Sequence, residues 1–280
     1  FIGLSELWFN NSRYTAAIFN ILTLVALFWL LYLLLGSSLL SSALVTLFSF
    51  EKVFLAQMQY APLLDNIQLF FVLMSFAFFV KFYKSGKLQS LVPAMLTLGL
   101  VISTKFWITG FTILVVWLLS LLANRDFKKI KYVLLALPLT LAPLLASYYQ
   151  SFVQGMTIRE FFGTQKYIYS WHSAKLEFNP IAVWDFLLFG RWHNQGEIKQ
   201  AVDWQLTWPI IGILSILAIY QLIKQYKKSG AKDSIYIIGI WFIVYFALLS
   251  VSTVNARYLF PILPAMYALS GWVIKEKLRL

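Results

Sequence analysis

Long apolar stretches separated by short basic loops constrain this chain more than any other feature. Nine of them approach the roughly 20 mainly apolar residues that a helix needs to cross a bilayer. Only 12% of the 280 residues are charged and 60% are hydrophobic, whereas a soluble domain carries about 25% charged residues. The sequence therefore predicts an all-α polytopic membrane protein. The expected spans are 14–35, 38–57, 62–83, 88–104, 106–123, 130–149, 205–223, 234–251 and 257–274.

The basic residues are divided unevenly between the two sides of this predicted bundle. Fourteen of the 23 basic residues lie in three loops and the C-terminal tail. If the nine spans hold, these four segments are all on one side. The other side then has nine basic and eight acidic residues. Short loops rich in lysine and arginine stay in the cytoplasm, so we expect a cytoplasmic C-terminus. The net charge of +12 is then a topology signal and does not indicate nucleic-acid binding. The fourteen are Lys81, Lys84, Lys87, Arg125, Lys128, Lys129, Lys131, Lys224, Lys227, Lys228, Lys232, Lys275, Lys277 and Arg279.

One outer segment, from about residue 148 to residue 204, is much longer than the other loops. Its stretch YIYSWHSAKLEFNP, Tyr167 to Pro180, alternates aromatic rings with polar and charged residues. Tyrosine and tryptophan favour the headgroup region, where the ring is buried and its polar edge stays wet. Loops this long usually have a function. We therefore expect a long exofacial loop with short interfacial helices, one of them in VWDFLLFGRW, Val183 to Trp192.

Several classes of site are excluded by residue types that the sequence lacks or holds in small number. There are no cysteines, hence no disulfides or thiolate metal sites, and the two histidines are too few for a histidine-rich metal centre. Neither GxGxxG nor GxxxxGK[ST] occurs, which argues against an ATP-driven pump or a soluble nucleotide-using enzyme. We expect no metal and no cofactor. The chain opens without methionine or a signal-peptide pattern, so we expect an internal fragment that lacks the N-terminal part.

Three ionisable residues lie near predicted span ends on the outer side, where such side chains are costly and are functional candidates. They are Asp65 in QYAPLLDNIQLFF, Lys105 in GLVISTKFWITG and Arg257 in STVNARYLFPILP. Arg257 is the strongest, because a guanidinium binds phosphate through two hydrogen bonds and keeps its charge. The alternative is that each side chain reaches the interface or pairs with a neighbour to stabilise packing.

For four further polar residues on the outer side, a functional role must likewise be compared with a structural one. Glu51 and Lys52 end the second predicted span, and we expect these adjacent charges to serve only the surface. His172 is surrounded by acidic and aromatic residues, which favours a role in a site, although a lone histidine in such a loop is more often structural. His193, in GRWHNQGE, is expected to be an exposed loop residue.

Five segments follow one another along nearly the whole chain: SELWFNNSRYTAAIFNILT, QYAPLLDNIQLFF, GLVISTKFWITG, FFGTQKYIYSWHSAKLEFNPIAVWDFLLFGRW and ARYLFPILPAMYAL. Together they resemble the dolichyl-phosphate-mannose–protein mannosyltransferases, membrane glycosyltransferases of the GT-C superfamily. The resemblance implies one transmembrane domain, 1–280, within which residues 148–204 form the exofacial loop. It also implies a polyprenyl-phosphate-linked sugar as donor and a hydroxyl of a protein or lipid outside the cytoplasm as acceptor.

The resemblance also implies roles for the residues that match its motifs. The catalytic carboxylate of the family lies in the first outer loop, so the catalytic base is expected before residue 1 and the 280 residues are expected to be inactive by themselves. Arg257 and Lys105 would bind the donor phosphate, and Asp65 would support catalysis by orienting the acceptor or a cation. Three loop residues would border the donor sugar or the acceptor: Tyr169, Trp171 and His172.

The sugar and the acceptor stay open at this stage. The chain has Tyr60 where the family often has arginine, and Asn179-Pro180 where it tends to have His-Pro, so mannose or another hexose is the expected sugar. A prokaryotic cell membrane is the expected location. The alternatives are a secondary transporter or lipid flippase, and a non-catalytic membrane subunit. Transporters place charges near the bilayer midplane, whereas here they gather at the outer boundary.

Overall fold

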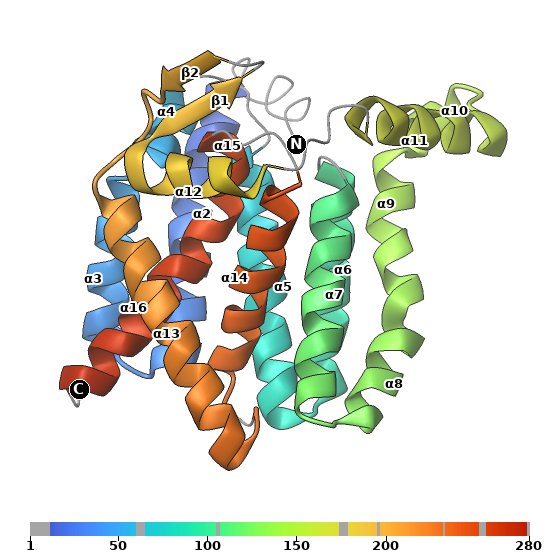
Figure 1. The fold of residues 1–280 in the computed structure, drawn as a ribbon. Helices are drawn as coiled ribbons and strands as arrows, with labels where there is room; N and C mark the ends of the chain where they lie inside the picture. Colours follow the sequence, from blue (N-terminus) through green and yellow to red (C-terminus); the bar gives the residue numbers. More distant parts are fainter. Residues whose placement is uncertain are drawn as a thin grey trace.

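The computed structural model describes residues 12–59, 65–104, 107–173, 179–194, 197–231, 233–251 and 256–278. These residues form a bundle of helices, with several short elements and a two-stranded antiparallel hairpin gathered at one end, uppermost in Figure 1. We call this the hairpin end and the opposite end the basic end. The elements are α2 (Ser12–Leu35), α3 (Ser38–Ser49), α4 (Lys52–Gln59), α5 (Asp65–Ser85), α6 (Leu88–Thr104), α7 (Trp107–Ala123), α8 (Phe127–Ala136), η1 (Leu137–Thr140), α9 (Leu141–Ser147), α10 (Tyr149–Val153), α11 (Ile158–Ser173), α12 (Pro180–Phe189), β1 (Arg191–Asn194), β2 (Glu197–Gln200), α13 (Thr207–Ser229), α14 (Ile235–Leu249), α15 (Ala256–Leu259), η2 (Phe260–Ile262) and α16 (Leu263–Leu278).

Four stretches among the described residues are long and apolar enough to cross a membrane: Tyr14–Leu35, Asp65–Ser85, Phe127–Ser147 and Thr207–Lys228. The predicted all-α membrane fold is therefore confirmed. The described helices α3, α6, α7 and α14 coincide with further predicted spans but are shorter than 18 residues. The expected number of nine complete spans is thus not confirmed.

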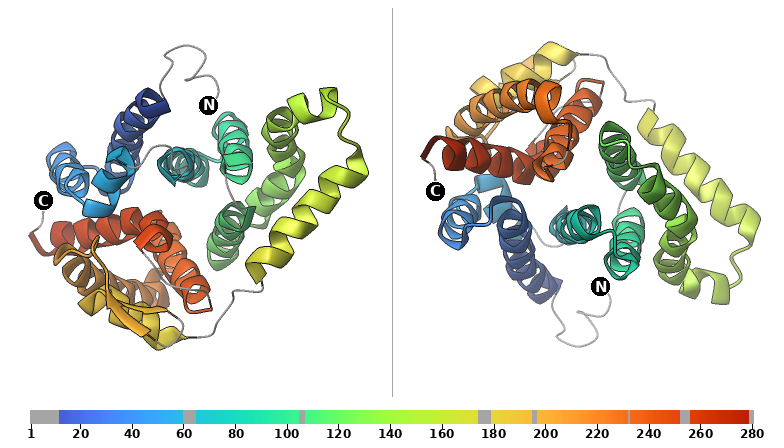
Figure 2. Two further views of the ribbon diagram at one scale, coloured as in Figure 1. Left: turned by 90° about the horizontal axis from the view of Figure 1, so that it is seen from above. Right: turned by 90° about the horizontal axis from the view of Figure 1, so that it is seen from below.

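Helix α5 is the most enclosed of the four stretches, with 78% of its apolar window buried. Helices α2 and α6 pack on one side of α5, and the later helices lie on its other side, as the end-on views of Figure 2 show. Two aromatic stacks join it to these later helices. The ring centroids of Phe76 and Trp241 in α14 lie 4.0 Å apart, and those of Phe79 and Trp117 in α7 lie 4.4 Å apart. Because such stacks add to the burial of large apolar area, α5 is a rigid support for the residue at its start.

The second predicted span, 38–57, is wrong as a single helix. Helix α3 ends at Ser49, and after a turn at Phe50 and Glu51 the chain begins a separate helix, α4. The backbone N–H groups of Phe50 and Glu51 donate to the last turn of α3 at 3.2 and 3.0 Å. The physical reason for the break is that the Glu51 side chain turns into the bundle, where it meets distant partners.

The predicted span 130–149 is a curved rod that consists of α8, the 3₁₀ turn η1 and α9. Pro138 is the second residue of the 3₁₀ turn, in keeping with the loss of a backbone donor at proline. Only 11% of the apolar window of this rod is buried, and it stands at the edge of the bundle beside α6 (Figures 1 and 2). At the contact, Gly99 lies so close that an added Cβ would come within 2.4 Å of the Thr140 carbonyl oxygen.

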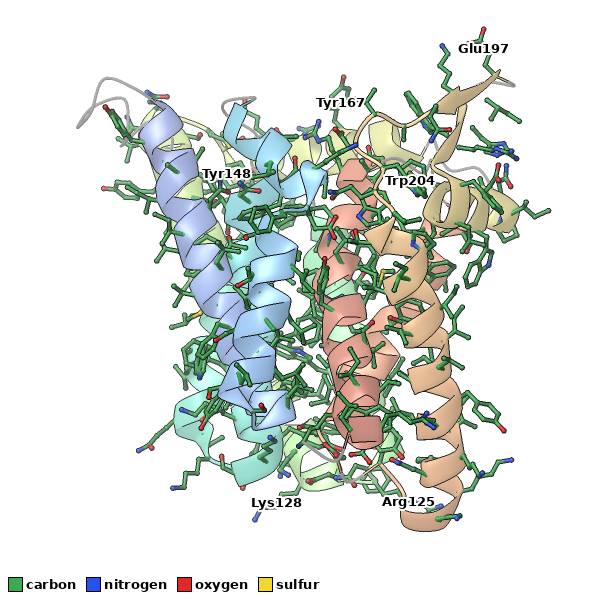
Figure 3. The ribbon with its side chains drawn as sticks, turned by 90° about the vertical axis from the view of Figure 1, so that its left-hand side faces the viewer. Arg125, Lys128, Tyr148, Tyr167, Glu197 and Trp204 are labelled. Atoms are coloured by element: carbon green, nitrogen blue, oxygen red, sulfur yellow. The ribbon has the colours of Figure 1, made fainter. Side chains whose placement is uncertain are left out.

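The lysine-rich loops lie together at the basic end. Figure 3 shows Arg125 and Lys128 there, opposite Tyr148, Tyr167, Glu197 and Trp204 at the hairpin end. This arrangement agrees with the predicted separation of charge between the two sides. The cytoplasmic location of the basic end stays a prediction from the positive-inside rule.

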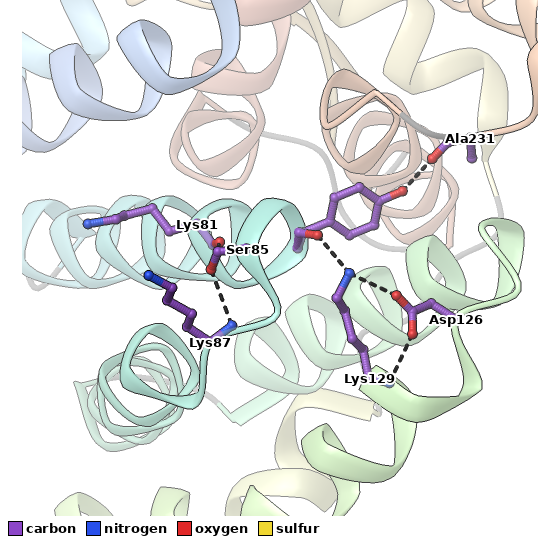
Figure 4. A network of polar contacts seen from close by, with 7 residues as sticks. Lys81, Ser85, Lys87, Asp126, Lys129 and Ala231 are labelled. Carbon is purple, nitrogen blue, oxygen red and sulfur yellow. Dashed lines mark hydrogen bonds and ion pairs between the residues drawn. The ribbon is translucent and has the colours of Figure 1, made fainter.

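Some of these lysines also hold helix ends together. Lys129 Nζ donates to the Tyr83 carbonyl at the end of α5, 2.9 Å away, and forms a 2.8 Å ion pair with Asp126 (Figure 4). The Tyr83 hydroxyl in turn donates to the Ala231 carbonyl. Burial raises the pKa of the Asp126 carboxyl, but the hydrogen bonds and charge of Lys129 outweigh this effect and leave the pKa below its ordinary value. Cations at helix C-termini stabilise carbonyls that lack an intrahelical partner.

The predicted exofacial loop, 148–204, contains α10, α11, α12 and the hairpin. The helix expected at Val183 to Trp192 exists but is α12, which begins at Pro180 and ends at Phe189. Asn179 accepts at its side chain from the Ala182 N–H, 3.0 Å away, and Gly190 ends the helix in the left-handed conformation. The strands β1 (Arg191–Asn194) and β2 (Glu197–Gln200) then pair, with Trp192 opposite Lys199. This hairpin was not predicted from the sequence.

Helix α11 begins with a reciprocal capping box, which gives it a predictable pH dependence. Glu160 Oε2 accepts from the Thr157 N–H at 2.7 Å and from its hydroxyl at 2.9 Å, while Thr157 Oγ1 accepts from the Glu160 N–H at 3.2 Å. The backbone hydrogen bond from Thr157, followed by the hydroxyl bond, holds the pKa of Glu160 below its ordinary value of 4.5.

Because the pKa of Glu160 is lowered by folding, the cap should stabilise α11 fully above the ordinary pKa and lose this effect as pH falls through the lowered value. Hydrogen exchange of the first turn of α11, corrected for intrinsic rates, should therefore accelerate on acidification. In Glu160→Gln the amide oxygen still accepts but does not titrate, so the variant is the matched control. An equal acceleration in this variant would contradict the prediction.

Candidate functional site

An ion pair at the hairpin end joins two residues that are far apart in sequence. Arg257, in α15, donates from Nε and Nη2 to Asp65 Oδ2, at 3.0 and 2.8 Å. Asp65 is the first residue of α5, where the helix dipole favours a negative charge. Its side chain is only 5% exposed, whereas that of Arg257 is 46% exposed. The buried carboxylate thus holds the base of the guanidinium while much of the cation stays accessible.

The structure therefore brings together two of the predicted site residues, Asp65 and Arg257. The helices that carry these residues fix the position of the pair. Asp65 is fixed by the enclosed helix α5, and Arg257 by the segment α15–η2–α16, whose residues from Leu259 to Val273 are buried throughout except for the half-buried Pro261. Such a pair can hold an anion at the exposed edge of the arginine, because a guanidinium presents donors in a planar fork. The pairing corresponds to one role predicted for Asp65, that of orienting a cation.

The other predicted site residues lie outside the part of the chain whose side chains are described. Lys105 is outside the described residues, and of Tyr169, Trp171 and His172 only the backbone is described, at the end of α11. The Gln68 amide of α5 reaches the Val101 carbonyl of α6 at 3.5 Å, so the end of α6 lies beside the start of α5. The predicted convergence of Arg257 and Lys105 on one phosphate stays a prediction.

Polar residues buried between α2 and α5 surround the start of α5 and were missed by the sequence analysis. Asn66 donates from its amide to the Asn20 side-chain oxygen, and Thr23 Oγ1 lies 2.6 Å from the Phe19 carbonyl and 3.3 Å from that of Asn66. Interhelical hydrogen bonds of this kind hold membrane helices in register. The signal was present in the sequence, since Asn66 adjoins Asp65 in an otherwise apolar segment.

Glu51 contradicts the prediction that it serves only the surface. Its side chain is 1% exposed and accepts hydrogen bonds from Thr207 Oγ1 at 2.8 Å, from Trp208 Nε1 at 2.7 Å and from the Tyr267 hydroxyl. A buried carboxylate needs such partners to offset its lost hydration. Lys52 is exposed, as expected, and its backbone N–H donates to the Gln205 side chain at 2.6 Å.

His193 also contradicts the prediction of an exposed loop residue. It belongs to β1, is half-buried, and its Nε2 lies 2.7 Å from Asp185 Oδ2 in α12. Arg191 Nη1 approaches the other oxygen of Asp185 at 3.7 Å. The sequence could not indicate this because the contact depends on the turn at Gly190, which folds the hairpin back onto α12.

Two other features of the described residues do not add to the site. No group of three or more His, Cys, Asp and Glu side chains that could hold a metal ion occurs among them. A cavity of about 140 Å³ lies between α6, α7 and η1, but its walls are apolar apart from Thr140. It is lined by Leu98, Ile102, Gly110, Phe111, Leu114, Leu137 and Thr140.

The family model for dolichyl-phosphate-mannose-protein mannosyltransferases matches residues 8–159, more than half of the chain. The chain belongs to this family. The matched part of this mannosyltransferase-family chain includes Asp65 and the break at Glu51, whereas Arg257 lies beyond it. The family predicted from the five sequence segments is confirmed.

The fold of this family member is also found among solved structures. The crystal structure of ArnT from Cupriavidus metallidurans in the apo state superimposes with a TM-score of 0.71 at 17% sequence identity. The match covers 97% of this chain and 47% of the ArnT chain, so the chain spans about half the length of that protein. At this identity the likeness shows the fold alone. No curated protein sequence matches the chain.

Proposed function

We propose that the protein transfers a sugar from a polyprenyl-phosphate donor to a hydroxyl of a protein or lipid on the non-cytoplasmic face of a membrane. The observation that carries this proposal is the Arg257–Asp65 pair in a member of a family of lipid-phosphate-dependent mannosyltransferases. The helix that carries Arg257, α15, lies at the hairpin end of the bundle (Figure 1). The name of the family supports mannose, and another hexose is the alternative donor sugar.

The proposed reaction is an inverting transfer. A carboxylate base takes the proton of the acceptor hydroxyl, whose oxygen forms a bond to the anomeric carbon. The bond from that carbon to the phosphate oxygen breaks, and the lipid phosphate leaves with the electron pair. Arg257, together with Lys105, would stabilise the negative charge that develops on this phosphate, and Asp65 would hold Arg257 in place. Tyr169, Trp171 and His172 would border the sugar or the acceptor.

The direct test uses the full-length protein in proteoliposomes with a labelled polyprenyl-phosphate sugar and an acceptor with free hydroxyl groups. We expect label on the acceptor and free polyprenyl phosphate in equal amounts, and no transfer from a sugar nucleotide. Movement of the donor across the bilayer without transfer would favour a flippase instead. Transfer from a sugar nucleotide alone would contradict the proposed donor.

A further inference from the structure

Glu51 joins three parts of the chain at the hairpin end, and no role in the proposed reaction explains it. Its carboxylate lies at the turn between α3 and α4 and accepts from Thr207 and Trp208 at the start of α13 and from Tyr267 in α16. These partners leave the carboxylate enclosed, so it cannot act on a substrate. Because its three donors come from α13 and α16, the side chain favours the arrangement that keeps these helices against the turn.

Two further sets of contacts hold the same junction. The Gln205 side chain accepts from the Lys52 N–H at 2.6 Å and donates to the Phe50 carbonyl at 3.2 Å, which binds the turn to the segment before α13. Beneath the turn, the ring of Phe48 in α3 lies against Tyr267, with centroids 5.6 Å apart. The start of α16 is therefore fixed against α3 and α4 by both polar and apolar contacts.

This junction is connected along the chain to both segments that carry the ion pair. On one side of Glu51 the chain continues through α4 towards Asp65, and on the other side Tyr267 belongs to the continuous segment α15–η2–α16 that carries Arg257. Helix α3 packs against α2, and α2 packs along α5. A shift of α16 along α3 would therefore move Arg257 relative to Asp65. The Glu51–Tyr267 hydrogen bond opposes such a change.

We propose that Glu51 is a positioning residue that holds Arg257 in register with Asp65 by binding α13 and α16 at once. This inference rests on the proposed function, because it assigns Glu51 an effect on transfer that acts only through Arg257. Glu51 is thus a determinant of the anion-binding geometry without touching the anion.

The chemistry of the three donors provides a conservative variant. Glu51 Oε1 accepts from the two hydroxyls, of Thr207 and Tyr267, and Oε2 accepts from the indole of Trp208. A hydroxyl can also accept, whereas an indole N–H is only a donor. In Glu51→Gln the amide nitrogen can donate to both hydroxyls while the amide oxygen accepts from Trp208. All three contacts are therefore retained in Glu51→Gln and lost in Glu51→Ala.

The test measures transfer by the full-length protein in proteoliposomes, with rates normalised to folded protein. Glu51→Ala should lower kcat by about 10-fold or more, since small displacements of an oriented group are costly, and Glu51→Gln should restore most of this loss. In an Arg257→Ala background, Glu51→Ala should lower kcat by less than about 3-fold further, because the guanidinium that Glu51 positions is already absent. Ser215→Ala is the matched control, since it removes another buried contact between α13 and α16 at 3.3 Å and should leave kcat unchanged.

The outcomes separate this inference from the proposed function. If Glu51→Ala and Arg257→Ala reduce transfer independently, so that their effects multiply, the positioning role is overturned while the proposed role of Arg257 stands. If Glu51→Gln is as impaired as Glu51→Ala, or Ser215→Ala is equally impaired, positioning by these hydrogen bonds is also overturned. If Arg257→Ala alone transfers at the normal rate, the proposed phosphate site fails first and the inference fails with it.

Discussion

Replacing Arg257 with alanine is expected to slow sugar transfer by about 10²- to 10³-fold, the usual effect of removing one fixed group that stabilises a developing anion. The guanidinium is held by the buried Asp65 carboxylate and is 46% exposed, so its free edge can meet a phosphate. Arg257→Lys should recover only part of the rate, because an ammonium supplies a point charge without a planar fork. Initial rates with a labelled polyprenyl-phosphate sugar measure both effects.

Arg257→Ala should also lower the stability of the protein, and this effect must be separated from its effect on the transfer rate. It leaves the buried Asp65 carboxylate without its guanidinium partner, at an expected cost of about 1–3 kcal/mol in the free energy of unfolding. Adding Asp65→Asn removes this buried charge, so the double variant should regain stability but not transfer. Arg159→Ala, which removes an exposed arginine from α11, is the matched control for net charge. Normal turnover of Arg257→Ala would remove this residue from the site.

Replacing Gly190 with alanine is expected to destabilise the protein by about 3 kcal/mol, from a strained backbone and overpacking together. Gly190 has a φ of +68°, and an added Cβ would lie 2.5 Å from Trp204 Cγ and 2.6 Å from Gln200 Nε2. Its carbonyl also accepts from the Ala201 N–H at 2.8 Å. The new methyl group should therefore push the hairpin away from α12 and break the contact between His193 and Asp185.

Gly36 provides the matched control for this variant. Its φ is +67°, but nothing lies within 4 Å of an added Cβ. Gly36→Ala should therefore show the cost of the backbone conformation alone, about 1 kcal/mol. Thermal unfolding in the same lipid or detergent compares the two variants. Equal losses of stability would mean that the close packing of Gly190 against Trp204 contributes little.

The helical membrane fold could be predicted because apolar length and charge placement are local properties of the sequence. The interruption of the second span could not, since the partners of Glu51 lie 156 to 216 residues further along the chain. The hairpin was missed because Glu197 to Gln200 are exposed at every position and show no apolar alternation.

The site was predictable in part for the same reason. An aspartate and an arginine at the ends of apolar segments stand out by their cost in a membrane, and the structure pairs Asp65 with Arg257. The sequence did not indicate that they are partners, because that depends on how α15 meets α5. Asn20 and Asn66 were overlooked because neutral amides are a weaker signal than charges. The roles of Lys105, Tyr169, Trp171 and His172 stay predictions.

The sparsely buried rod of α8, η1 and α9 makes the bilayer itself a structural partner of the protein. Its 21 residues extend roughly 31 Å at 1.5 Å per residue, close to the thickness of a typical hydrocarbon core, about 30 Å. In a thinner membrane such a rod accommodates the mismatch by leaning over. Helix α11 follows the upper end of the rod through α10, so its aromatic end would shift as well. Acyl-chain length is therefore expected to change the position of α11 at the hairpin end.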